Sequence, residues 1–539
     1  MTDQPHRRPA PIAAALTATV AICALIVTPV PTLPTTAAAA ERPPLAASQG
    51  NGEPEPPLPQ GAIDDEPDLP VGADEDEPDL PAGADEDEPK LPTGAEPAVP
   101  EIPDEPDLPI GAEPETKPTD ANEPSAAWLD RLAEAGLTGF WEARGGFRTQ
   151  NDRYEKDASL GETRLQLDLE RPIEWLTVKL VADFVYDGVL EDCSVDLETG
   201  RGWIDLRQAN VSFSPLPFMD AKIGRQILTW GTGDLLFIND LFGKDWQAFF
   251  IGRDVEYLKA PSDAAKVSLF SKLANLDVVF TPRFDADRFI RGRRLSYYNA
   301  MLGRQAGRDA VVEDDAPDEW FRDHEWAARL SRNIRGYELA AYGYWGYWKS
   351  PGGLDPANGR ATFPRLSVYG ASARGQLGPG IANVEAGYYD SRQDRTGDDP
   401  FVNNSQLRLL AGYEQDLPAV ARDLTVGVQY YVELMMDYDR HVASLRRIGR
   451  PRPRADDDRH VITGRVTKLM MNQNLTLSLF AYYSPTDSDA YLRPNAQYRI
   501  DDHWTVEVGG NIFFGGRDDT FFGQFENNSN VYASLRCGF

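Results

Sequence analysis

The fold is decided by the stretch FMDAKIGRQILTWGTGDLLFINDLFGKDWQAFFIGRDVEY, residues 218–257. It opens with the alternation of a β-strand, up to about Leu228, and continues as an apolar, aromatic loop. Loops of this length are uncommon in compact domains, and a loop this apolar is unfavourable in water. If the flanking strands belong to a large closed barrel, the concave surface that can bury the loop is the barrel interior. The stretch therefore predicts a barrel with an inward loop, residues 229–264.

Residues 137–539 supply the strands of that barrel. Many segments alternate apolar and polar residues with period two, the weak signature of transmembrane β-strands. We expect an all-β, antiparallel transmembrane β-barrel of about eighteen strands, with sixteen as the alternative count. The joins alternate between short turns and, with one exception, long polar loops, which is typical of outer-membrane barrels. An even strand count places both chain ends on the short-turn side, so we expect both termini in the periplasm of a bacterium.

Three segments precede the barrel. Residues 1–40 predict a secretory signal peptide, with Arg7 and Arg8 before an apolar run and small residues before Glu41. Residues 41–124 carry 25 acidic and 3 basic side chains and repeat the unit EPDLPxGA. A segment this polar and this rich in proline cannot form a buried core. We therefore expect a disordered, extended periplasmic spacer that is able to bind a periplasmic partner. Residues 125–136 predict one short periplasmic helix.

Composition excludes several functions. The formal net charge of −31 argues against nucleic acid as a partner, because phosphate binding needs clustered Lys and Arg. The chain has no HExxH and no CxxCH motif, so we expect no metal, no haem and no other cofactor. The remaining catalytic alternative is a barrel enzyme with rim acids around Asp456–His460, and we do not expect an enzyme.

The chain ends on an alternating apolar strand that closes with the aromatic Phe539. This ending is similar to the signal that outer-membrane proteins present to the β-barrel assembly machinery. Aromatic side chains are enriched where a membrane protein meets the lipid interface. The residues that we expect in such a belt are Trp345, Tyr347, Trp348, Tyr430, Tyr482 and Tyr483.

A family resemblance becomes specific at Ile223–Gly231, IGRQILTWG, followed by Asp234 and Asn239–Asp240. This segment resembles the Gly-Arg-Gln…Trp-Gly segment of bacterial outer-membrane porin-like barrels, including uncharacterised porin-like and alginate-export-like families. The resemblance implies a barrel strand that runs into a loop narrowing a channel. The motif covers about twenty residues of the chain, and it names no solute.

A channel needs a water-filled lumen, a constriction and fixed charges that set its selectivity. The candidates in and around the inward loop are Arg225, Asp234, Asp240, Lys244, Asp245 and Arg253. The lumen-facing candidates on the strands are Arg164, Arg329, Arg408, Arg465 and Arg493. The alternative for both sets is that they pair with nearby carboxylates or cap the loop, with no direct role in transport.

A basic cluster lies within residues 283–324. Its members are Arg283, Arg288, Arg291, Arg293 and Arg294. They could attract an anionic solute, bind lipopolysaccharide phosphates, or pair with the acidic Glu313–Asp315 later in the same loop.

Two functions fit the sequence. The first is an outer-membrane porin, or substrate-selective diffusion channel, for small hydrophilic solutes. The second is a structural or scaffolding barrel, embedded in outer-membrane lipid, whose lumen is sealed and whose spacer tethers a periplasmic partner.

Overall fold

The computed structural model describes residues 136–190, 194–450 and 455–539. The predicted signal peptide, the spacer and the expected helix up to residue 135 lie outside the described residues, as does Cys193. Everything below concerns the described residues.

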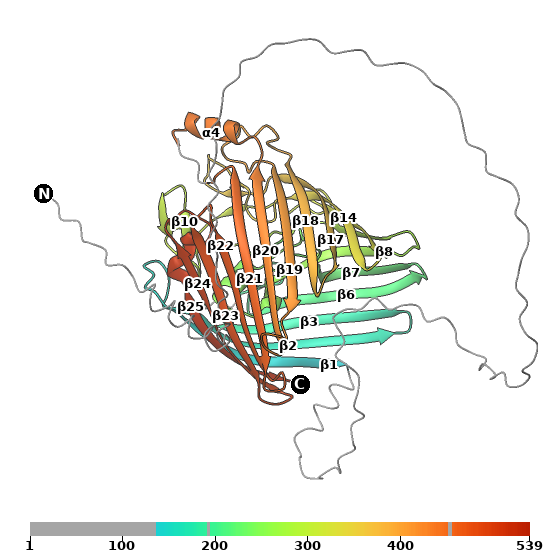
Figure 1. Ribbon diagram of the computed structural model, residues 1–539. Helices are drawn as coiled ribbons and strands as arrows, with labels where there is room; N and C mark the ends of the chain where they lie inside the picture. The colour runs from blue at the N-terminus through green and yellow to red at the C-terminus, as the bar shows by residue number, and fades with distance from the viewer. Residues whose placement is uncertain (1–135, 191–193, 451–454) are drawn as a thin grey trace, which may run out of the picture. The chain divides into compact units, whose positions relative to one another are not determined.

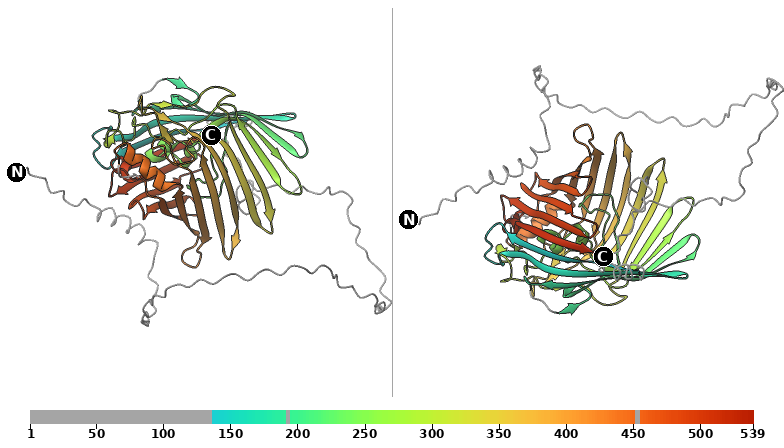
Figure 2. Two further views of the ribbon diagram at one scale, coloured as in Figure 1. Left: turned by 90° about the horizontal axis from the view of Figure 1, so that it is seen from above. Right: turned by 90° about the horizontal axis from the view of Figure 1, so that it is seen from below.

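Eighteen strands form one sheet in which neighbours are antiparallel and follow each other in chain order, and β25 pairs with β1 to close it (Figure 1). In the two end views the wall curves round into a ring (Figure 2). The prediction of an eighteen-stranded antiparallel barrel is confirmed. The barrel strands are β1 (Leu137–Arg148), β2 (Ala158–Ile173), β3 (Leu176–Asp187), β6 (Ile204–Leu216), β7 (Met219–Ile227), β8 (Pro261–Leu269), β9 (Asn275–Thr281), β13 (Glu325–Ile334), β14 (Tyr337–Tyr347), β17 (Arg365–Leu377), β18 (Gly380–Ser391), β19 (Gln406–Asp416), β20 (Leu424–Met435), β21 (Asp458–Met470), β22 (Leu475–Ser484), β23 (Asp489–Arg499), β24 (Trp504–Gly515) and β25 (Asn530–Gly538).

The connections differ at the two ends of the barrel. One end carries short turns, and the other carries long loops except at residues 485–488, between β22 and β23. The long loops lie toward the upper left in Figure 1, with α4 at the top and β10 on the left. The small elements of the loops are β4 (Val195–Asp196), β5 (Arg201–Gly202), α3 (Trp246–Ile251), η1 (Val255–Leu258), β10 (Tyr297–Asn299), β11 (Arg304–Ala306), β12 (Asp314–Asp315), β15 (Gly353–Leu354), β16 (Ala361–Thr362), α4 (Tyr438–Arg447) and η2 (Gly523–Asn528). None of the described helices is long and apolar enough to cross a membrane.

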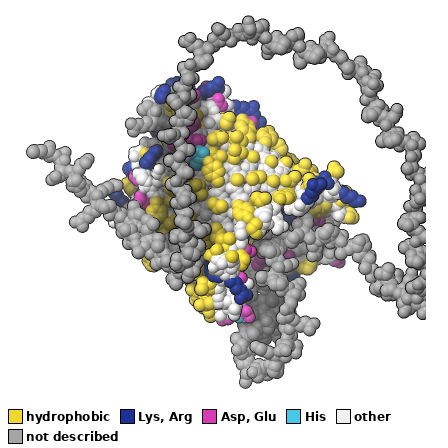
Figure 3. Space-filling view, viewed as in Figure 1, with side chains coloured by type: hydrophobic (Ala, Val, Ile, Leu, Met, Phe, Trp, Pro, Cys, Tyr) yellow, Lys and Arg dark blue, Asp and Glu magenta, His cyan; other side chains and the backbone are white. Residues whose placement is uncertain are grey.

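The outer face of the wall is apolar. On β3, Leu180 and Phe184 are 41% and 37% exposed, whereas the intervening Asp183 is fully buried on the inner face. Side chains such as Val384, Val428 and Val508 repeat this pattern around the sheet. Hydrophobic side chains cover the middle of the wall in Figure 3, and Lys and Arg gather toward its ends. An alternating apolar exterior of this kind is the surface of a transmembrane barrel.

The predicted aromatic belt is half wrong. Trp345, Tyr430 and Tyr483 are exposed on the outer face as expected. The other three, Tyr347, Trp348 and Tyr482, are at most 7% exposed and lie inside the molecule. Successive strand residues point to opposite faces, so Tyr482 and Tyr483 cannot both face lipid.

The chain end is built into the wall. Phe539 exchanges two backbone hydrogen bonds of 2.9 Å with Gly139 at the start of β1. Cys537 on the same strand is a free cysteine. The first and last barrel strands therefore pair with each other and close the wall, and the chain end lies at the short-turn end.

A charge on the outer face should destabilise the barrel. Val428→Arg places a cation where the wall meets hydrocarbon, which costs about 2–4 kcal/mol near the membrane midplane. We expect a lower temperature for the loss of heat-modifiable gel mobility in lipid vesicles. The matched control is Thr467→Arg on the neighbouring strand, whose side chain shares the inner face with Arg465 and meets no lipid. Equal loss of stability in both variants would contradict the assignment of the two faces.

Candidate functional site

Residues 228–260, between β7 and β8, lie inside the barrel. Ile238 and Ile251 are fully buried, and Phe249 is 2% exposed, in one apolar cluster with wall residues such as Tyr491. The loop ends at residue 260, before the end of the expected range 229–264, because β8 begins at Pro261. Proline lacks an N–H but is tolerated at the first position of a strand.

The loop contains two short helical elements, α3 and η1, and α3 has a defined start and end. Asp245 caps α3 by accepting a hydrogen bond from Ala248 N at 2.7 Å. The helix ends at Gly252, whose φ of +94° favours glycine. A Cβ at this position would also meet the ring of Tyr532 on β25, so the residue must be glycine for two reasons.

One stretch of the loop, Thr232–Asn239, lies along the inner face of the wall from β17 to β22, and we call it the crossbar. Glu385 on β18 accepts hydrogen bonds from the backbone N–H groups of Thr232 and Gly233, the second at 2.8 Å. The same carboxylate accepts a bond of 2.9 Å from Asn239 Nδ2. Since both ends of the crossbar bind one buried carboxylate, Glu385 is its principal anchor.

Other wall residues hold the middle of the crossbar. Gln429 on β20 accepts from Asp234 N at 2.7 Å and donates to Asp234 O at 2.9 Å. Arg465 on β21 forms an ion pair with the Asp234 carboxylate. The Tyr389 hydroxyl donates to Ile238 O at 2.5 Å. These contacts satisfy backbone groups that would otherwise be unpaired inside the barrel.

Two glycines make room for the crossbar in the wall. Gly370 on β17 and Gly387 on β18 are directly opposite each other in the sheet. A Cβ at Gly370 would meet the Asn239 side-chain oxygen, and a Cβ at Gly387 would lie 2.6 Å from Ile238 Cγ2. The pair forms a notch without side chains in which the crossbar is seated.

The second half of the loop is tied to the opposite wall. Arg493 on β23 donates to Phe249 O at 3.0 Å and to Arg253 O at 2.8 Å. Arg144 on β1 donates to Gly252 O at 2.8 Å. Arg253 itself pairs with Glu162 on β2, at 3.0 Å for its Nε. The loop therefore crosses the lumen and is attached on both sides.

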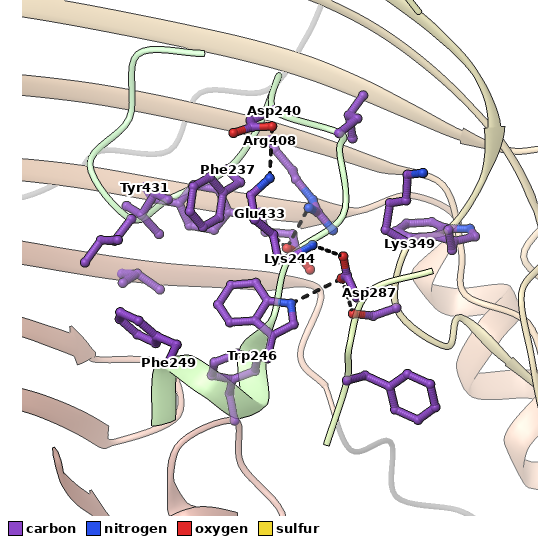
Figure 4. Close-up of a pocket in the computed structure, with 18 of the residues that line it drawn as sticks. Phe237, Asp240, Lys244, Trp246, Phe249, Asp287, Lys349, Arg408, Tyr431 and Glu433 are labelled. Carbon is purple, nitrogen blue, oxygen red and sulfur yellow. Dashed lines mark hydrogen bonds and ion pairs between the residues drawn. The ribbon is translucent and has the colours of Figure 1, made fainter. Parts of the chain in front are cut away.

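The structure places the predicted loop charges in pairs. Lys244 Nζ lies 2.9 Å from Asp240 Oδ1, and both side chains are buried (Figure 4). Asp245 caps α3 and approaches Arg288 at 3.4 Å. Arg225 forms a two-pronged pair with Asp263, at 3.0 and 3.2 Å, on the neighbouring strand.

The five strand arginines also face inward, and each has a partner. Arg408 lies 3.3 Å from Glu433, and Arg493 binds the loop carbonyls described above. The remaining three pair with carboxylates, Arg164 with Asp183, Arg329 with Glu338 and Arg465 with Asp234. Paired lumen charges of this kind fix the wall and the loop relative to each other.

The basic cluster does not form one patch. Arg294 is fully buried and pairs with Glu162 and Asp187, and Arg288 pairs with Asp205 at 2.9 Å. Arg291 pairs with Asp314 at 2.6 Å, so the basic and acidic halves of the loop do bind each other. Arg283 pairs with Glu198, and Arg293 is exposed.

Two cavities lie on opposite sides of the crossbar. The outer cavity, of about 400 Å³, faces the long loops and is lined by residues such as Phe237, Trp246, Trp348 and Phe521 (Figure 4). The inner cavity, of about 260 Å³, lies toward the short turns and is lined by polar residues. They include Thr232, Asp234, Arg374, Asn383, Glu414 and Arg465. The crossbar therefore separates an aromatic chamber from a polar one.

Sequence reasoning missed the anchors of the crossbar. Glu385 and Gln429 are single polar residues on the inner faces of strands, and such residues commonly just meet water in a lumen. Their bonds to the loop join positions 146 to 195 residues apart, so no local pattern contains them. The available signal was the pair Gly370 and Gly387, because glycine within a strand indicates close approach of another backbone.

No family model matches the chain, and no curated protein matches it. Solved structures similar to it include OccAB3 of Acinetobacter baumannii, with 11% identity and a TM-score of 0.44, covering 75% of this chain and 99% of that one. OccK11 of Pseudomonas aeruginosa has 9% identity and a TM-score of 0.43, covering 75% and 96%. OprB of Pseudomonas putida has 11% identity and a TM-score of 0.38, covering 77% and 97%. The function proposed below therefore rests on the barrel, the loop and the cavities of this chain.

The carboxyl group of Asp285, in the long loop that follows β9, has a raised pKa. Burial raises the pKa of Asp285 to about 7, and the carboxylates of Glu325 and Asp263 act in the same direction. The ammonium group of Lys349 opposes the shift. An unfolded Asp ionises near pH 3.9, so between about pH 4 and 7 the folded protein holds more protons than the unfolded chain. Stability must therefore fall as the pH rises through this window.

Asp285→Asn should remove this pH dependence, because the amide stays uncharged. We expect the variant to unfold at a higher temperature than the wild type at pH 8 and at nearly the same temperature at pH 5. Thermal unfolding of both proteins in lipid vesicles at pH 5 and pH 8 measures this difference in unfolding temperature. The matched control is Asp318→Asn in the same loop, where the carboxylate is exposed. A stabilisation of Asp285→Asn that is equal at both pH values would contradict the proposed titration.

Proposed function

We propose that the protein is a bacterial outer-membrane diffusion channel with a loop-controlled passage. The observation that carries this proposal is the pair of cavities separated by a single stretch of loop, Thr232–Asn239. A solute would enter the outer cavity, pass the crossbar when it moves aside, and leave through the inner cavity. The long loops would then face the outside, and the short turns and both ends of the chain would face the periplasm.

The wall and the lumen support this reading. The apolar outer face suits a lipid bilayer, and the aromatic chain end at Phe539 suits recognition by the assembly machinery. The crossbar is held by hydrogen bonds, one ion pair and the apolar packing of Ile238, and its polar contacts can be broken and remade without unfolding the barrel. The acidic spacer would extend into the periplasm, and exposed arginines such as Arg293 would meet lipopolysaccharide phosphates outside.

Charge selectivity would arise at the crossbar. Asp234 and Arg465 form an ion pair that lines the inner cavity, beside Arg374 and Glu414. Opposed charges across a narrow passage create a transverse field that orients passing solutes. By contrast, Arg225 lines neither cavity, because it is paired with Asp263 between β7 and β8.

A sealed scaffolding barrel is the second candidate. The observation that favours it is the apolar cluster that joins the loop to the wall, from Ile238 to Phe513. A loop packed this tightly could close the lumen permanently. The two functions differ in one property, because a channel shows discrete conductance in a planar bilayer and a scaffold of the same fold does not.

Removing the crossbar anchor should open the passage. Glu385→Ala deletes the acceptor for Thr232, Gly233 and Asn239, so the crossbar should leave its notch more often. We expect single-channel conductance, or the fraction of time open, to rise severalfold, with unchanged barrel folding on gels.

The matched control for this variant is Glu338→Ala. Glu338 also carries a carboxylate on a barrel strand, but it pairs with Arg329 of the neighbouring strand. Its removal should leave the crossbar in place and conductance near the wild-type level. A silent bilayer for wild type and Glu385→Ala alike, with both correctly folded, would favour the scaffold.

A further inference from the structure

The outer cavity has the chemistry of a binding site. Its lining is mostly aromatic and aliphatic, with a few polar groups, which is the usual composition of a small-molecule site. From its residues we infer that it binds an uncharged solute with an aromatic ring and an oxygen that accepts a hydrogen bond. This inference deepens the proposed channel function by naming the class of solute, and it departs from the hydrophilic solutes expected from sequence.

The aromatic character comes from three separate parts of the chain. The loop supplies Phe237 and Trp246, whose ring centres are 6.0 Å apart in a T-shaped arrangement. The wall and a neighbouring loop supply Tyr389 and Trp348, stacked at 5.8 Å. The last long loop adds the 43%-exposed Phe521. Rings with free faces and edges around one space favour a further aromatic ring between them.

The charged residues of the cavity already have partners. Arg408 lies 3.3 Å from Glu433, and its guanidinium stacks 4.0 Å from the centre of the Tyr389 ring. Arg459 lies 2.7 Å from Asp487.

The two lysines in the lining are paired as well. Lys349 lies 2.6 Å from Glu325, and Lys244 lies 2.9 Å from Asp240 (Figure 4). An anionic solute would have to displace one of these carboxylates, and removing one partner of a buried pair is costly. The cavity therefore disfavours a carboxylate relative to an uncharged ring of the same size.

One buried donor in the lining lacks a partner. Trp348 is 7% exposed, and among the described residues its indole Nε1 has no hydrogen-bond acceptor. An unpaired buried donor destabilises the folded protein. The nitrogen is closed off in this structure, so the indole ring, which lines the cavity, must turn to present it to a solute oxygen. The bond formed would then satisfy the donor, which is why the ligand should carry an acceptor as well as a ring.

The test measures binding by calorimetry on the full-length protein in lipid nanodiscs. Phenyl β-glucoside provides an uncharged ring with an ether oxygen, methyl β-glucoside lacks the ring, and benzoate carries a charge. We expect phenyl β-glucoside to bind at least about tenfold more tightly than methyl β-glucoside, the gain expected for burying one ring. We expect benzoate to bind more weakly than phenyl β-glucoside.

Three variants and one control assign that binding to the cavity. Trp348→Phe keeps a ring but removes the donor, and should weaken phenyl β-glucoside about fivefold. Phe521→Ala should weaken it by a similar factor, whereas the control Phe321→Ala, at a 70%-exposed aromatic outside the cavity, should not. Glu433→Gln frees Arg408 and should strengthen benzoate binding.

The outcomes separate this inference from the channel proposal, because calorimetry does not require ion flow. Ring-dependent binding that is lost in Trp348→Phe and Phe521→Ala supports the site, whether or not the barrel conducts. Tighter binding of benzoate than of phenyl β-glucoside by the wild type would overturn it. So would equal weakening in Phe321→Ala, or an absence of heat with phenyl β-glucoside at millimolar concentration.

Discussion

A closed barrel offers an apolar loop one way to leave water, which is to enter the barrel's own lumen. Residues 228–260 take that route, and most of the interior follows from it. Apolar side chains such as Phe249 and Ile251 pack against wall aromatics, but the loop backbone also needs hydrogen-bond partners once it is out of water. The wall supplies them through Glu385, Gln429 and Arg493. The loop thus requires a lumen wall that offers both apolar side chains for packing and polar side chains for hydrogen bonds.

The charges of the lumen follow the same rule. A buried ion is costly unless it is paired and hydrogen-bonded. Most of the arginines that point inward are accordingly matched by carboxylates or loop carbonyls, as in Arg253 with Glu162 and Arg493 with Phe249 O. This pairing leaves the outer cavity without a free charge to attract ions. Its selectivity must then come from aromatic contacts and single hydrogen bonds, while the polar inner cavity retains the Asp234–Arg465 pair.

Much of this fold is readable in the sequence. Period-two alternation and the contrast of short turns with long loops predict eighteen strands and their order, because both are local features of the chain. The apolar character of the loop predicts that it must be buried. The sequence does not predict which wall residues hold it, since Glu385 and Asn239 meet only after closure. It also misassigns Trp348 and Tyr482 to the lipid interface, because an aromatic side chain suits a membrane surface and a lumen equally.

In the proposed channel, solutes pass only when the crossbar moves. A disulfide that locks it to the wall tests this directly. Asn239→Cys and Gly370→Cys place two thiols where the Asn239 side chain now fills the notch, in a protein whose Cys193 and Cys537 are replaced by Ser. Single-channel recording before and after reduction gives the measurement. The account predicts no openings while the disulfide is formed and normal openings after reduction. Equal conductance in the oxidised and reduced protein, with the disulfide verified by mass spectrometry, would contradict it.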